Sequence, residues 1–348
     1  MLKKILVLPA LLGSAILTLT GCSAQTVAGA DGTAAQLSVV ATTTQVADFT
    51  RNIIGDAGAV KLTQLIQPNQ SAHSYDPSAA DLTALGAADV LVINGVGLEE
   101  WLDAAIEASG FDGVTIDADE GITISPVGAG TDHANDQADV HADDTPDTHG
   151  DTATHAHGDG DPHIWTDVHN AQTIVHTITA GLIAADKNDA ATFTTNATAY
   201  DAQLAALDEW IHTNVDAVPA NDRLLVSNHD ALGYFTAAYH IDYVGSVIPS
   251  FDDNAEPSAA EIDSLVAAIK KTGVAAVFSE ASLSPKTAET IATEAGVTVY
   301  SGDDALYVDS LGPRDGAGGT YLKAQVHNVT LMLESWGVTP TALPANLQ

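Results

Sequence analysis

The chain has little cysteine and little positive charge. Its 348 residues include one cysteine, Cys22, so no disulfide can form within the chain. Lysine and arginine together number 11 against 46 aspartates and glutamates, which gives a formal net charge of −35. Nucleic acid and anionic lipid surfaces are poor partners for such a chain, because like charges repel. The same negative field raises the local concentration of cations.

The apolar stretch near the N-terminus is too short for a membrane helix. It covers Ile5–Thr20, is interrupted by Pro9, and falls short of the about 20 residues that cross a bilayer. Lys3 and Lys4 precede it, which is typical of an export signal. The stretch leads into Leu19-Thr20-Gly21-Cys22, which resembles the lipobox of bacterial lipoproteins.

This resemblance predicts a signal peptide over residues 1–21 and a diacylglycerol on the sulfur of Cys22. The protein is then anchored by lipid on the extracytoplasmic face of the cell membrane, or lies in the periplasm. The alternative is a simple secretion signal that happens to contain a cysteine. Residues 22–37 are small and polar, so we expect them to form a flexible tether.

After the tether, strand and helix patterns alternate, which predicts an α/β fold with parallel sheets and helices on both faces. Apolar runs predict strands over 37–41, 60–66, 89–94, 224–228, 243–248, 275–279 and 297–300. Periodic spacing predicts helices over 45–56, 78–87, 98–109, from about 170, 189–218, 230–239, 258–271, 285–295 and 320–336.

The remaining length of about 310 residues exceeds one comfortable core and indicates two lobes. We expect an N-terminal lobe over residues 38–188 and a C-terminal lobe over residues 219–348. One long helix over residues 189–218 joins them, and Pro219 ends it.

Four short segments each carry a residue that can bind a transition metal. Three are histidines, His73, His163 and His229, and the fourth is Asp309. Several of these residues follow predicted strands, and open α/β sheets bind ligands at the carboxyl ends of their strands. Three imidazoles and one carboxylate suit a closed tetrahedral Zn²⁺ site. Two ligands fall in each lobe, so the metal would lie in the cleft between the lobes.

The segments around these residues resemble the zinc/manganese solute-binding lipoproteins of bacterial metal ABC transporters. The matching words occur in order: His73-Ser-Tyr-Asp-Pro-Ser, Asn94-Gly-Val-Gly-Leu-Glu-Glu-Trp101, Asp161-Pro-His-Ile-Trp-Thr-Asp167, Asn228-His-Asp-Ala-Leu-Gly-Tyr-Phe235, Phe278-Ser-Glu-Ala-Ser-Leu-Ser-Pro285 and Val308-Asp-Ser-Leu-Gly312.

The resemblance implies two lobes joined by a rigid helix, a metal bound between them, and a permease partner of an ABC importer. By resemblance His73, His163 and His229 are the imidazole ligands and Asp309 is the carboxylate ligand. Manganese-selective members tend to carry glutamate at the position of His229, so the histidine favours zinc. We expect a monomer that captures and delivers Zn²⁺ without catalysing a reaction.

Two further carboxylates are candidates for orienting the ligand imidazoles through hydrogen bonds. Glu280 follows a buried apolar strand and would need a partner there. Asp76 stands where the family usually has glutamate, although an aspartate before Pro77 also suits a turn.

A loop over residues 131–159 has no apolar periodicity and resembles the histidine-rich insert of zinc-specific members. Its histidines would be weak accessory ligands that raise the local Zn²⁺ concentration, and the alternative is an acidic spacer. They are His133, His141, His149, His155 and His157.

Two other functions remain open at the level of the sequence. The first is a Mn²⁺ or Fe²⁺ carrier of the same family. The second is a zinc hydrolase, in which three histidines and an open position generate hydroxide. Asp309 fills that open position, and the chain has no His-Glu-x-x-His motif, so the hydrolase is disfavoured.

Overall fold

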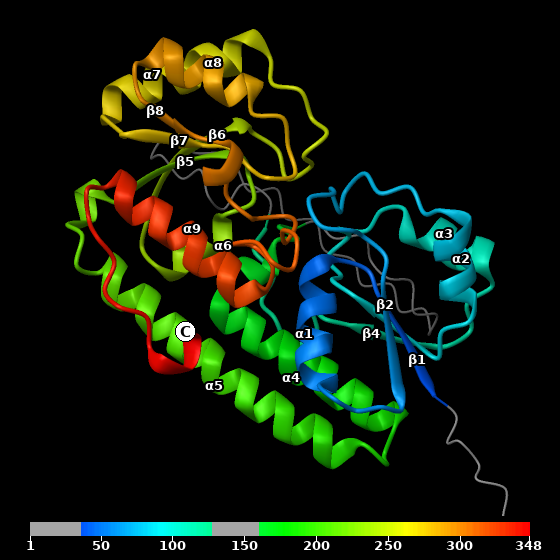
Figure 1. Ribbon diagram of the computed structural model, residues 1–348. Helices are drawn as coiled ribbons and strands as arrows, with labels where there is room; N and C mark the ends of the chain where they lie inside the picture. Colours follow the sequence, from blue (N-terminus) through cyan, green and yellow to red (C-terminus); the bar gives the residue numbers. More distant parts are fainter. Residues whose placement is uncertain (1–35, 127–159) are drawn as a thin grey trace, which may run out of the picture. The chain divides into compact units, whose positions relative to one another are not determined.

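A computed structural model of the chain describes residues 36–126 and 160–348, which form parallel strands flanked by helices (Figure 1). The expected signal peptide, Cys22 and the loop histidines lie outside the described residues. The strands are β1 (Leu37–Ala41), β2 (Val60–Gln64), β3 (Val90–Ile93), β4 (Val114–Asp117), β5 (Leu224–His229), β6 (Asp242–Ile248), β7 (Ala276–Phe278) and β8 (Thr298–Tyr300). The helices are α1 (Thr44–Ile54), α2 (Ala79–Gly86), α3 (Leu102–Ser109), α4 (Val168–Ala185), α5 (Ala190–Val215), α6 (Gly233–Ala238), α7 (Ala259–Thr272), α8 (Lys286–Ala295) and α9 (Tyr321–Ser335).

The first half of the chain forms a parallel sheet in the order β2-β1-β3-β4. Alternate residues of its strands face opposite sides, as the pleat requires. Val39 and Val92 belong to the core cluster that includes residues of α1 and α4. Val40 and Leu91 belong to a second cluster with residues of α2 and α3. Both faces of this sheet are therefore covered by helices.

The second half contains two parallel pairs, β5 with β6 and β7 with β8, and β5 lies beside β7. Val226 and Val277 pack with Leu265 of α7 and Ile291 of α8. Their neighbours in the strands belong to the main core cluster, which also includes residues of α9. The predicted α/β class with parallel strands in both halves is confirmed; the residue numbers of the lobe boundaries stay a prediction.

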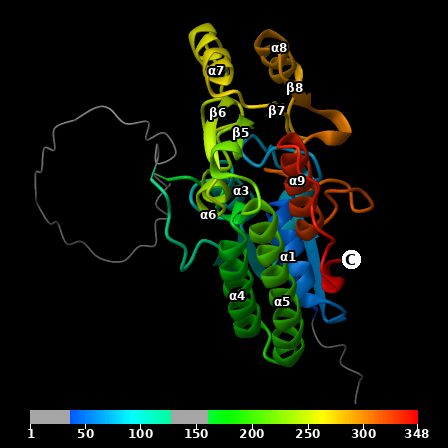
Figure 2. The same ribbon diagram turned by 90° about the vertical axis from the view of Figure 1, so that its left-hand side faces the viewer.

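Helix α5 is the longest regular element of the described residues. Its 26 residues span about 39 Å at about 1.5 Å per residue. It packs against α1 and α4 from the first half and against α9 from the second half. Figure 2 shows α4 and α5 lying along each other. In the ranges that the structure describes, no helix combines the length and the hydropathy needed to cross a membrane.

Candidate metal centre

The four predicted metal-binding side chains converge on one point. Each of His73, His163, His229 and Asp309 offers a ligand atom, and all four atoms lie within 4.8 Å of one another. His73 lies in the loop after β2, and His229 is the last residue of β5. His163 directly precedes a short 3₁₀ turn, and Asp309 lies in the loop between β8 and α9. Residues far apart in the sequence thus meet at one site.

Four of the six distances between the ligand groups are close to those of a tetrahedral site. The Nε2 atoms of His163 and His229 are 3.4 Å apart. The Asp309 carboxylate lies 3.3 Å from Nε2 of His73, 3.4 Å from that of His163 and 3.1 Å from that of His229. A tetrahedron with bonds of about 2.0–2.1 Å to Zn²⁺ has edges of about 3.3–3.4 Å. All four ligand atoms lie within 4.8 Å of one another, so they can bind one such ion once they close around it.

Carboxylates fix the orientation of two of the imidazoles. The Nδ1 atom of His163 is 2.6 Å from Asp161 Oδ1, and the Nδ1 atom of His229 is 2.5 Å from Glu280 Oε1. An ionised carboxylate only accepts hydrogen bonds, so each Nδ1 carries the ring proton. The backbone N–H groups of the same two histidines also donate to Asp161 and Glu280. Each ring is thereby held with the lone pair of its Nε2 directed into the site.

The interior of the site consists of acceptor atoms. Neither oxygen of Asp309 has a hydrogen-bond partner among the described residues, although Asp309 is only 2% exposed. The Nε2 atom of His73 is likewise buried without a hydrogen bond. Buried acceptors without donors are costly, and a cation satisfies all of them at once. The donor set therefore fits a divalent metal ion.

Without metal, the site attracts protons. Burial alone would lower the pKa of His229, but the charges of Asp309 and Glu280 outweigh burial and raise that pKa well above its usual value. Burial also lowers the pKa of His73, but the hydrogen bond and charge of Asp309 outweigh burial and raise this pKa above its usual value. Burial would raise the pKa of Asp309, but the adjacent imidazoles hold it well below its usual range. Metal must therefore compete with protons for the same atoms.

The loop that carries Asp309 is fixed by residues from the first half of the chain. The carbonyl oxygen of Val308 accepts hydrogen bonds from Gln45 Nε2 at 2.9 Å and from Trp165 Nε1 at 3.0 Å. The N–H of Leu311 donates to Thr44 Oγ1 at 2.8 Å. These bonds hold the carboxylate opposite the imidazoles of His73 and His163.

The loop that carries His163 is held by the turn after β3. Asn94 Nδ2 donates to the carbonyl oxygen of Pro162 at 3.0 Å. The backbone N–H groups of Asn94 and Gly95 donate to the carboxylate of Glu99. Burial raises the pKa of Glu99 to about 7. This buried carboxylate therefore helps to position the peptide that precedes His163.

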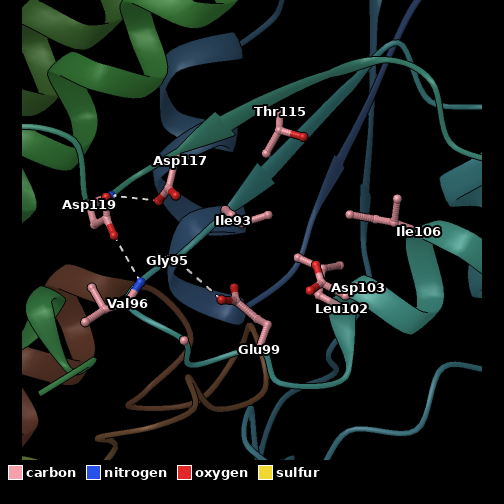
Figure 3. Close-up of a pocket in the computed structure, with 11 residues that line it drawn as sticks. Ile93, Gly95, Val96, Glu99, Leu102, Asp103, Ile106, Thr115, Asp117 and Asp119 are labelled. Atoms are coloured by element: carbon pink, nitrogen blue, oxygen red, sulfur yellow. Dashed lines mark hydrogen bonds between the residues drawn. The ribbon is translucent and has the colours of Figure 1, made fainter. Parts of the chain in front are cut away.

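An acidic pocket of about 340 Å³ lies next to this turn (Figure 3). Three of its carboxylates, those of Glu99, Asp117 and Asp119, accept hydrogen bonds from backbone N–H groups. Asp119 accepts the N–H of Val96 at 3.0 Å, and Asp117 accepts the N–H of Asp119 at 3.3 Å. Val96 has a φ of 52°, which is uncommon for a β-branched residue, and the bond from Asp119 stabilises it. We interpret this pocket as support for the turn.

The remaining predicted residues are placed as follows. Glu280 contacts His229, where the sequence pattern suggested a partner for an imidazole. Asp76 is exposed and makes no hydrogen bond with any of the four ligand residues, so its assignment to the site is corrected. Asp161 accepts the hydrogen bond from the imidazole of His163. This role was not predicted from the sequence, because an aspartate before proline resembles a turn residue. Its position in the word Asp-Pro-His163 was the available signal.

The described fold and site are those of a protein that binds a metal ion in its interior. Residues 39–335 match the family described as zinc-uptake complex component A, periplasmic. The chain belongs to this family, whose members are substrate-binding proteins of ABC metal importers. It is accordingly a metal-binding component of such an importer.

The names of similar proteins specify different metals. Manganese-binding lipoprotein MntA of Halalkalibacterium halodurans is 30% identical, over 89% of this chain and 91% of that protein. Zinc-binding protein AdcA of Streptococcus pyogenes is 29% identical, over 75% of this chain and 49% of that protein. The periplasmic zinc-binding protein TroA of Treponema pallidum has a similar structure with a TM-score of 0.71 and 25% identity, covering 86% of this chain and 99% of TroA.

Proposed function

We propose that this protein captures Zn²⁺ outside the cytoplasmic membrane and delivers it to the permease of an ABC importer. The observation that carries the choice of metal is the donor set. Three imidazole nitrogens and one carboxylate converge within 4.8 Å, and four of their six separations, at 3.1–3.4 Å, are close to those around a tetrahedral ion. Zn²⁺ favours imidazole nitrogen and four ligands, whereas Mn²⁺ favours more oxygen ligands.

A Mn²⁺ or Fe²⁺ carrier is the second candidate, because the relative MntA is named as manganese-binding. Asp309 directs both oxygens at the imidazoles, so a fifth bond from its carboxylate is geometrically open. Elemental analysis of protein purified without added metal, followed by calorimetric competition between Zn²⁺ and Mn²⁺, separates the two candidates. Zinc in the purified protein and displacement of bound Mn²⁺ by Zn²⁺ support our proposal; the reverse order supports a manganese carrier.

The residues of the site are tested by substitution. We expect His73→Ala, His163→Ala and His229→Ala each to weaken Zn²⁺ binding at least about tenfold, because each removes one bond to the ion. His240→Ala is the control, since His240 lies outside the cluster. Full Zn²⁺ affinity of the His229→Ala protein in calorimetry would contradict the assignment.

We further propose that a lipid on Cys22 keeps the protein close to its permease and that the loop over residues 131–159 gathers zinc. Several relatives are named lipoproteins, which supports the anchor. All four metal-binding residues belong to this chain, so metal binding as proposed needs no second copy.

A further inference from the structure

Asp253 is a buried carboxylate close to the metal centre. It lies in the loop between β6 and α7 and is 6% exposed. Neither of its oxygens has a hydrogen-bond partner among the described residues. The cost of burying an ionised carboxylate in this way is high unless a cation or a donor compensates it. Among the described residues only the hydroxyl of Ser71 lies near enough to affect it as a donor, and no side-chain cation pairs with it, so a bound cation is the natural candidate.

The loop that carries Asp253 lies against the metal site. The carbonyl oxygen of Ser250 accepts the N–H of Asp230, the residue after His229. The ring centroid of Phe251 lies 6.0 Å from that of His163. The β6–α7 loop is therefore fixed at both of these ligand-bearing segments.

Charges of the site act directly on Asp253. Burial raises the pKa of Asp253, and the nearby hydroxyl of Ser71 lowers it. The charge of Asp309 raises this pKa further, whereas His73 and His229 lower it. Asp253 in turn contributes to the raised pKa of His73. The carboxylate is thus near the cluster without belonging to the four atoms that converge on one point.

Asp253 lies on the side of the cluster that solvent can reach. The side chain of His73 is 9% exposed, whereas those of His163, His229 and Asp309 are 0% exposed. Ser71, the neighbour of Asp253, accepts the backbone N–H of His73 at 3.2 Å. An ion that comes from solvent therefore meets the His73 side of the site first.

We propose that Asp253 is the first protein ligand of an incoming divalent cation and passes the ion to the three imidazoles. This role rests on the proposed function, since it concerns metal capture at the same site. The free oxygens of Asp253 bind the hydrated ion directly or through its waters, and the ion exchanges these contacts for those of His73, His163, His229 and Asp309. Asp253 therefore accelerates both arrival and departure of the ion and contributes little to the final affinity.

The test is stopped-flow measurement of Zn²⁺ association, with dissociation measured by transfer to a chelator. We expect Asp253→Asn to slow both rates by about fivefold or more and to leave the dissociation constant within about threefold, because a transient ligand lowers the barrier in both directions without changing the end states. Asp252→Asn is the matched control, because Asp252 is the exposed neighbour of Asp253. Asp253→Glu keeps the carboxylate and should retain rates close to those of the unchanged protein.

Each other outcome overturns the role. Unchanged rates in Asp253→Asn, or equal slowing in Asp252→Asn, would mean that Asp253 has no special part. Slower association with faster dissociation would make Asp253 a static charge that stabilises the bound ion. Unchanged association with faster dissociation would make it a permanent ligand. If the unchanged protein binds no Zn²⁺, the proposed function itself fails, and circular dichroism of each variant separates a folding defect from a kinetic one.

Discussion

The Nε2 atoms of His163 and His229 face each other at 3.4 Å, while both ring N–H groups point away toward Asp161 and Glu280. Two nitrogen lone pairs at this separation repel each other unless a cation or a proton lies between them. The hydrogen bonds that the imidazoles donate to these carboxylates are therefore not incidental packing. They hold the rings in the orientation that binds metal before the metal arrives.

We predict that Glu280→Gln and Asp161→Asn each lower Zn²⁺ affinity by about 10–100-fold, because the imidazole loses both its fixed orientation and part of its basicity. Calorimetry or chelator competition measures the change. Asp76→Asn is the control, since Asp76 is exposed and lies outside the site. Equal effects of all three substitutions would show that negative charge in general, and not the orientation of the rings, determines affinity.

Zn²⁺ affinity should fall with pH and begin to fall above the ordinary histidine pKa of 6.5. The metal binds the deprotonated imidazoles, and the carboxylates raise the pKa of His229 well above 6.5, so protons compete at neutral pH. His73, whose pKa is also raised, adds to the loss, while Asp309 stays ionised because its pKa is lowered. Titration from about pH 5 to about pH 8.5 tests this, and a flat affinity over that range would contradict a histidine-rich site.

Deletion of residues 131–159 should leave one tight Zn²⁺ site with nearly unchanged affinity. The four converging ligands are held by strands and loops outside that segment. Pro126 and Gly160 pair through a β-bridge, so a short connection between them preserves the chain path. Calorimetry should show the loss of weak additional equivalents, and uptake should slow when zinc is scarce. Loss of the tight site would mean that the segment supplies primary ligands.

Cys22→Ser should release the protein from the membrane into the soluble fraction or the medium. The expected lipid chains provide the anchor, because two or three acyl chains suffice for stable attachment. Fractionation followed by immunoblotting measures the distribution, with Ser23→Ala as a control next to the cysteine. Unchanged association of the Cys22→Ser protein with the membrane would contradict the lipid anchor.

Strong periodic patterns made most of the fold predictable from the sequence. The strand at Leu37–Ala41 has the predicted bounds, because four of its five residues are apolar and three threonines follow it. Strand β4 was missed, because it has four residues at the edge of the sheet and Val114 is 59% exposed. An edge strand pairs with one neighbour only, so its apolar and polar residues alternate weakly in the sequence. The pairing of β4 with β3 in the structure identifies it as a strand.

The start of a helix was less predictable wherever a tertiary contact reshapes the first turn. The helix expected from Leu98 begins at Leu102, because Glu99 turns back to accept the N–H groups of Asn94 and Gly95. The helix expected from Asp230 begins at Gly233, because strand β5 continues to His229 and the N–H of Ala231 turns back to the carbonyl oxygen of His229. The metal ligands could be predicted from short sequence motifs, whereas the hydrogen bond between Asp161 and His163 became evident only in the folded structure.

The four metal-binding residues are distributed from position 73 to position 309, and each lies on a different segment. An unfolded chain cannot gather these segments at low entropic cost, so the ion binds the folded state almost exclusively. The ion then stabilises the folded state: at a free metal concentration of about 100 times the dissociation constant, it adds about 2.7 kcal/mol to the free energy of unfolding. Thermal resistance of this protein should consequently report how much metal its surroundings contain.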